Sequence, residues 1–102
     1  MTVVSEQIIL KLMDGIMGAD KRANWFSCFS LIKTLYRSGR IGDDEALRGL
    51  QNLCADILFE KNPDMDERTL LDQALDYAKK IFRSWRSELL KEKYLSMLRA
   101  SE

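Results

Sequence analysis

Large apolar residues recur every three or four positions along almost the whole of this 102-residue chain. That spacing places side chains on one face of an α-helix, whereas a half-buried β-strand needs strict alternation of apolar and polar residues. The pattern is clear in Ile9, Leu12 and Ile16 near the N-terminus, and no alternating run of useful length occurs anywhere. The chain is therefore predicted to be all-α, and its length suits a single helical domain over residues 1–102.

Glycine and proline mark where the helices should end. Gly18 and Gly39 follow periodic segments at positions suited to helix C-termini, and Pro63 cannot continue a helix. Because the connections are short, we predict an antiparallel up-down bundle of four helices. The last helix is expected to be either long and bent or split to give a fifth short C-terminal helix. The predicted helices cover about 3–17, 21–38, 43–61, 66–89 and 90–100.

The apolar pattern changes near Leu90. In an unbroken helix, Tyr94 and Met97 would lie about 120° around the axis from the earlier apolar stripe, at 100° per residue. One straight helix cannot bury both faces against one core, so the chain either bends near residues 86–91 or buries the second face against something else. We therefore predict a partner-binding segment, which consists of Arg86, Leu90, Lys91, Lys93, Tyr94, Leu95, Met97 and Leu98.

The chain has few of the residue arrangements that enzymes use for catalysis or metal binding. It has no histidine, which removes the commonest general base, the commonest zinc ligand and the usual activator of serine or cysteine nucleophiles. Cys28 and Cys54 are too far apart for a zinc site, which needs closely spaced pairs. The acidic run at residues 43–45 is typical of a helix N-terminus. We expect a protein that is not an enzyme and that has no catalytic residue, metal site or cofactor.

The two cysteines, Cys28 and Cys54, both fall at apolar positions of the helical pattern. Both are therefore predicted to be buried thiols. The chain shows neither a secretory signal nor an apolar stretch approaching the roughly 20 residues that a membrane span needs. We expect a protein without a membrane span that resides in the reducing cytoplasm.

Basic residues gather near the C-terminus, although 16 basic and 16 acidic residues cancel over the whole chain. A basic helical face can follow the phosphates of a nucleic acid or an acidic protein surface. Phe82 and Trp85 lie among these charges but belong to the core stripe, so a solvated charged face over a buried aromatic seam is the simpler interpretation. The candidate nucleic-acid-binding residues are Lys79, Lys80, Arg83, Arg86 and Lys93.

Three functions are consistent with these features. The first is a small non-catalytic protein-interaction module of adaptor, inhibitor, immunity or regulatory type, which binds another protein or a second copy of itself through the C-terminal segment. The alternatives are a nucleic-acid-binding helical protein and a self-assembling structural protein. The predicted arrangement resembles small bacterial immunity proteins against peptide bacteriocins, which are helical bundles of about this length with a distinctive C-terminal region. This resemblance lies in architecture and in no motif, so it assigns no residue a role.

Overall fold

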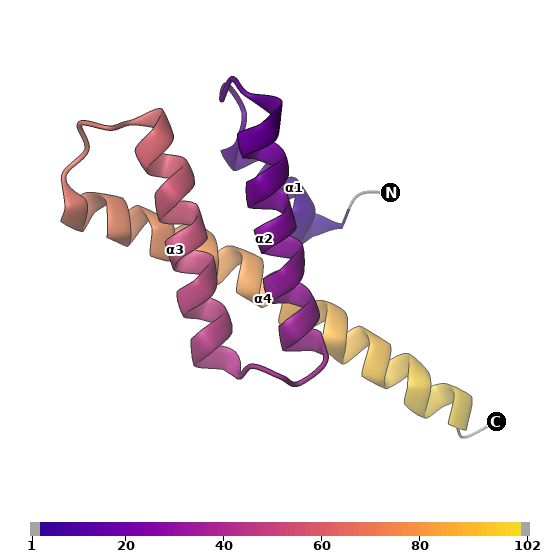
Figure 1. Cartoon of the computed structure of the whole chain (residues 1–102). Helices are drawn as coiled ribbons and strands as arrows, with labels where there is room; N and C mark the ends of the chain where they lie inside the picture. Colours follow the sequence, from indigo (N-terminus) through magenta and orange to yellow (C-terminus); the bar gives the residue numbers. More distant parts are fainter. Residues whose placement is uncertain (1–2, 101–102) are drawn as a thin grey trace.

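The computed structural model describes residues 3–100, which form four α-helices and contain no strand. Figure 1 shows α2 and α3 side by side as a helical hairpin, with α4 crossing behind them. The helices are α1 (Val4–Leu12), α2 (Ala19–Arg37), α3 (Asp43–Lys61) and α4 (Glu67–Ala100). The prediction of an all-α chain with four helices is confirmed, whereas a regular up-down bundle and a separate fifth helix are not confirmed.

The first helix is shorter than predicted, because α1 ends at Leu12 and not near residue 17. Gly15 and Gly18 take positive φ values of 83° and 116° in the connection to α2. Residues with a Cβ atom rarely adopt such angles, so the two glycines permit a turn that ends α1 and redirects the chain. Met13 and Ile16 lie in this connection and are still buried. The predicted apolar stripe is therefore completed by the turn and not by helix alone.

The last helix runs without a break for 34 residues, because no glycine or proline occurs between Glu67 and Ala100. Asp66 caps its start: the Asp66 Oδ2 atom accepts hydrogen bonds from the Thr69 hydroxyl at 2.8 Å and from the Thr69 backbone N–H at 3.0 Å. These bonds hold the pKa of Asp66 below its ordinary value. A helix of this length spans about 51 Å, so α4 sets the long axis of the described molecule, which measures 57 × 26 × 19 Å.

The core lies mainly between α3 and α4, the two helices with the most extensive mutual contact. Ala74 and Ala78 of α4 have no exposed surface, and their short side chains let neighbouring helices approach α4 closely. Burial recurs every three or four residues along α4, as an amphipathic helix requires. The buried stripe of this helix consists of Leu70, Ala74, Ala78, Ile81 and Trp85.

The second helix packs on α4 through aromatic rings. The ring centroids of Phe29 and Trp85 lie 5.5 Å apart, and those of Tyr36 and Phe82 lie 5.2 Å apart, within the range of favourable aromatic pairs. Most other side chains of α2 are exposed. Trp85 is buried and Phe82 is half-buried, so these two rings belong to the core and do not form a surface platform for stacking.

Candidate functional site

The C-terminal part of α4 extends past the core. Trp85 is the last buried residue of this helix, and every described residue from Leu90 onward is exposed. Figure 1 shows this end of α4 projecting away from the other three helices. We refer to residues 90–100 as the arm. Because its side chains are exposed, they are accessible to another molecule.

The arm carries a dense group of exposed apolar side chains. Five large ones fall between residues 90 and 98, and their exposed fractions range from 46% to 64%. A single exposed leucine is ordinary on a protein surface, but contiguous apolar patches are typical of interaction surfaces. The five belong to the partner-binding segment predicted from the sequence, and they are Leu90, Tyr94, Leu95, Met97 and Leu98.

The apolar side chains of the arm do not continue the buried stripe of α4. At 100° per residue, Tyr94 lies about 180° around the helix from Trp85, and Leu90 and Met97 lie within about 60° of Tyr94. These three residues therefore share the side of α4 opposite the core, which we call the outer side. Because α4 continues as one helix through this region, the second apolar face does not return to the core.

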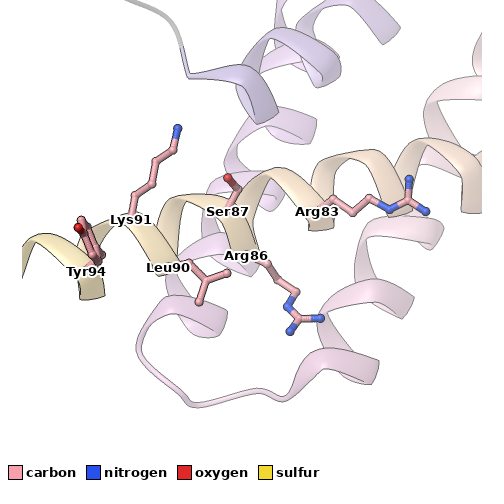
Figure 2. A pocket seen from close by; sticks show the side chains of 6 residues that line it. All are labelled: Arg83, Arg86, Ser87, Leu90, Lys91 and Tyr94. Carbon is pink, nitrogen blue, oxygen red and sulfur yellow. The ribbon is translucent and has the colours of Figure 1, made fainter.

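An open hollow of about 490 Å³ lies along the outer side of α4. Figure 2 shows Lys91 and Arg86 pointing to opposite sides of the helix, with Leu90 between them and Tyr94 beyond Lys91 toward the C-terminus. Since every lining residue comes from α4, the hollow is an open surface and not an enclosed pocket. The lining residues include no acid and are Arg83, Arg86, Ser87, Leu90, Lys91 and Tyr94.

The acidic side chains in this part of α4 face α2 instead. Glu88 Oε2 lies 3.1 Å from Lys33 Nζ, and Glu92 Oε1 lies 2.5 Å from Arg37 Nη2. Glu88 and Glu92 are the only carboxylate side chains between residues 80 and 100. The ion pairs therefore hold both acids toward α2, and between residues 80 and 100 the outer side of α4 carries positive charge alone.

The candidate nucleic-acid-binding residues divide into two groups. Four of them lie within about 80° of one another around α4, on its outer side. Lys80 is separate, because its Nζ atom lies 5.6 Å from the ring centroid of Tyr77 and its side chain lines a hollow with residues of α1 and α3. The four residues that remain together are Lys79, Arg83, Arg86 and Lys93.

Arg86 also influences a hydrogen bond that connects α2 to α3. The Tyr36 hydroxyl donates to Asp43 Oδ1 at 2.8 Å. Burial is the largest cause that raises the pKa of Tyr36, the Asp43 carboxylate raises it further, and the Arg86 cation opposes the shift. Arg86 is thus an electrostatic neighbour of Tyr36 as well as a candidate binding residue, so a variant at Arg86 would not test binding alone.

The two cysteines have different surroundings. Cys54 is buried on α3, Cys28 is exposed on α2, and neither forms a disulfide. The prediction of buried thiols is correct for Cys54 and wrong for Cys28. The reason is that α2 contacts the rest of the molecule through the face that carries its aromatic side chains, and Cys28 lies outside that face.

We expect a thiol reagent at about pH 8 to label Cys28 alone in the native protein and to label both cysteines after denaturation. Burial raises the pKa of Cys54 to about 12, so this thiol stays protonated and inaccessible in the folded state. The measurement is the absorbance released by a disulfide reagent such as DTNB. The Cys28→Ser variant is the control, and rapid labelling of its remaining thiol without denaturant would show that Cys54 is not enclosed.

Two absences apply to the described residues 3–100. No group of three histidine, cysteine, aspartate or glutamate side chains converges there to hold a metal ion. No helix in that range is long and apolar enough to cross a membrane.

No protein-family model, curated protein or solved structure matches the chain. A function must therefore be inferred from the surface of the molecule itself.

Proposed function

We propose that this chain is a small non-catalytic protein-interaction module that inserts its arm into a groove of another protein, as an adaptor, inhibitor or regulatory subunit would. The supporting observation is that Leu90, Tyr94 and Met97 are exposed and share the outer side of α4, away from the core. Their spacing of i, i+4 and i+7 is the spacing by which helices anchor in apolar grooves. Full burial of a leucine-sized side chain stabilises a complex by roughly 1.5–3 kcal/mol.

Charge indicates which partner fits the arm. Arg83, Arg86 and Lys91 flank the apolar side chains of the outer side, and no carboxylate lies among them. A second copy would present the same basic edges in a parallel or an antiparallel pair, so like charges would oppose self-assembly. A different protein that has an apolar groove with an acidic rim is the better match. We place this interaction in the cytoplasm, because free cysteines are typical of reducing compartments.

The first test is the oligomeric state of the full chain and of a chain that ends at Leu89. Both should be folded monomers by light scattering and circular dichroism, because the described core residues all precede the arm. A full-length dimer that becomes a folded monomer on truncation would contradict this expectation and support self-assembly. Loss of helical structure throughout the truncated chain would show that the arm belongs to the core.

The second test uses the double variant Leu90→Ala with Tyr94→Ala. It should lose the partner in a cross-linking pull-down, with affinity reduced about 100-fold or more, since large apolar anchors carry most interface energy. Helicity and melting temperature should stay unchanged, because both side chains are exposed. Leu31→Ala is the matched control: Leu31 is 58% exposed on α2, outside the arm, and its loss should leave the partner bound.

Binding to a nucleic-acid backbone is a second candidate function, favoured by the shared direction of Lys79, Arg83 and Lys93 on α4. Affinity would then fall steeply with added salt, because phosphate contacts release counterions. The variant Arg83→Glu with Lys93→Glu would abolish this binding without disturbing the neighbourhood of Tyr36. If single- and double-stranded DNA and RNA fail to shift in gels at low salt, this candidate is excluded.

A further inference from the structure

A second hollow lies between α1, α3 and α4, and none of its lining residues belongs to the arm. Its volume is about 350 Å³, which is within the size range of small-molecule sites. Three of the lining residues are lysines, and each of the three helices contributes one. The hollow is lined by Ile8, Lys11, Leu12, Lys61, Tyr77 and Lys80.

Within the described residues 3–100, the three lysines of this hollow have no acidic partner. No aspartate or glutamate lines the hollow, and none of the three ammonium groups forms an ion pair within residues 3–100. Asp76 precedes Lys80 by one helical turn, yet the two form no ion pair. Like charges gathered at one concave surface repel one another, so a bound anion would relieve this repulsion.

Two contacts hold basic side chains at the hollow. Lys61 Nζ donates a hydrogen bond to the backbone carbonyl oxygen of Leu12 at 2.7 Å, which satisfies one carbonyl at the C-terminal end of α1. Lys80 Nζ lies 5.6 Å from the ring centroid of Tyr77, within cation–π range. Each ammonium group has three N–H donors, so both retain donors for a ligand.

Apolar groups form the remainder of the lining. Leu12 is buried, and Ile8 and Tyr77 are half-buried. Such surroundings lower the effective dielectric constant, so an anion held there interacts more strongly with the lysines than it would on an open basic surface. Concave shape, three lysine side chains and apolar lining therefore occur together at this position.

We propose that this hollow binds a small, multiply charged anion of the phosphate class. Lysine acts as a compact point charge and is a common phosphate ligand, and three such charges at one hollow suit a small anion that carries several negative charges. The hollow contains three lysines and no arginine. This site is independent of the arm and of the partner proposed for it.

The test is a titration of the full chain with inorganic pyrophosphate at constant ionic strength, followed by amide chemical shifts in ¹H–¹⁵N NMR spectra. Saturable shifts should be confined to amides near Lys11, Lys61 and Lys80. The variant Lys11→Gln with Lys80→Gln should bind about tenfold more weakly, because it removes two of the three positive charges that line the hollow. Lys61 is left unchanged, since its bond to Leu12 supports the end of α1.

The matched control is Lys79→Gln with Lys93→Gln, which removes the same charge from the outer side of α4 and should bind within about twofold of the unmodified chain. Equal weakening in both double variants would overturn the proposal, because it would indicate general attraction to a basic protein. Shifts spread along the outer side, or no saturation, would overturn it as well. A parallel titration with citrate tests a carboxylate anion. Binding of citrate as tight as that of pyrophosphate would overturn the phosphate assignment.

Discussion

Replacing Trp85 with alanine is expected to lower the free energy of unfolding by about 3–5 kcal/mol, the usual cost of removing a large aromatic side chain from a core. Trp85 is 1% exposed, and its ring centroid lies 5.5 Å from that of Phe29 and 6.1 Å from that of Tyr36. The variant therefore removes the main support of α2 on α4. A domain of this size is stable by only about 5–15 kcal/mol, so the midpoint of urea unfolding should fall sharply.

The Trp85→Phe variant shows whether ring packing is the cause. Trp85 Nε1 is buried and has no hydrogen-bond partner among residues 3–100, and an unsatisfied buried donor of this kind costs about 1–3 kcal/mol. Phenylalanine removes that donor and keeps part of the ring contact, so its loss of stability should be much smaller than that of alanine. Circular dichroism is the appropriate signal, because replacing Trp85 leaves Trp25 as the only tryptophan and so changes the intrinsic fluorescence even without unfolding. Equal losses for both variants would contradict the packing explanation.

Replacing Ala78 with leucine is expected to lower the free energy of unfolding by about 1–3 kcal/mol or more, because a well-packed core has no room for extra methylene groups. Ala78 has no exposed surface and lies in the middle of the buried stripe of α4. A longer side chain there must push α4 away from the helices packed against it. Thermal unfolding followed by circular dichroism measures the effect.

Ala23→Leu is the control for Ala78→Leu. Ala23 lies on α2 and is exposed, so the same chemical change should alter stability by less than about 0.5 kcal/mol. If the two variants lose stability equally, the cost arises from the substitution itself and not from close packing at Ala78. If Ala78→Leu is as stable as the unmodified chain, α4 does not lie as close to its neighbours as the structure shows.

The helices could be predicted from the sequence because their signals are local. Apolar spacing identifies a helical face, and Gly39 and Pro63 lie just beyond the ends of α2 and α3. The end of α1 was placed too late, because Met13 and Ile16 keep the apolar spacing while Gly15 and Gly18 turn the chain. A periodic pattern shows which side chains are buried and does not show whether helix or turn positions them.

The second apolar face near the C-terminus was also a local signal, carried by Leu90, Tyr94 and Met97. The sequence alone could not decide between a bend and a projecting arm. The absence of glycine and proline after Pro63 favours one helix, but it does not show how far the other helices reach along α4. That reach depends on how α2 and α3 cross α4, which is a property of the packed molecule (Figure 1).

By itself, the sequence determined the helical class, the approximate helix positions and the presence of an apolar face that its own core stripe does not include. The tertiary structure alone decided which surfaces stay uncovered and which distant charges meet. It pairs Lys33 with Glu88, exposes Cys28 while burying Cys54, and brings three lysines from three helices to one hollow. The physical reason is that helical periodicity depends on neighbours three or four residues away, whereas contacts between helices depend on crossing geometry and side-chain size.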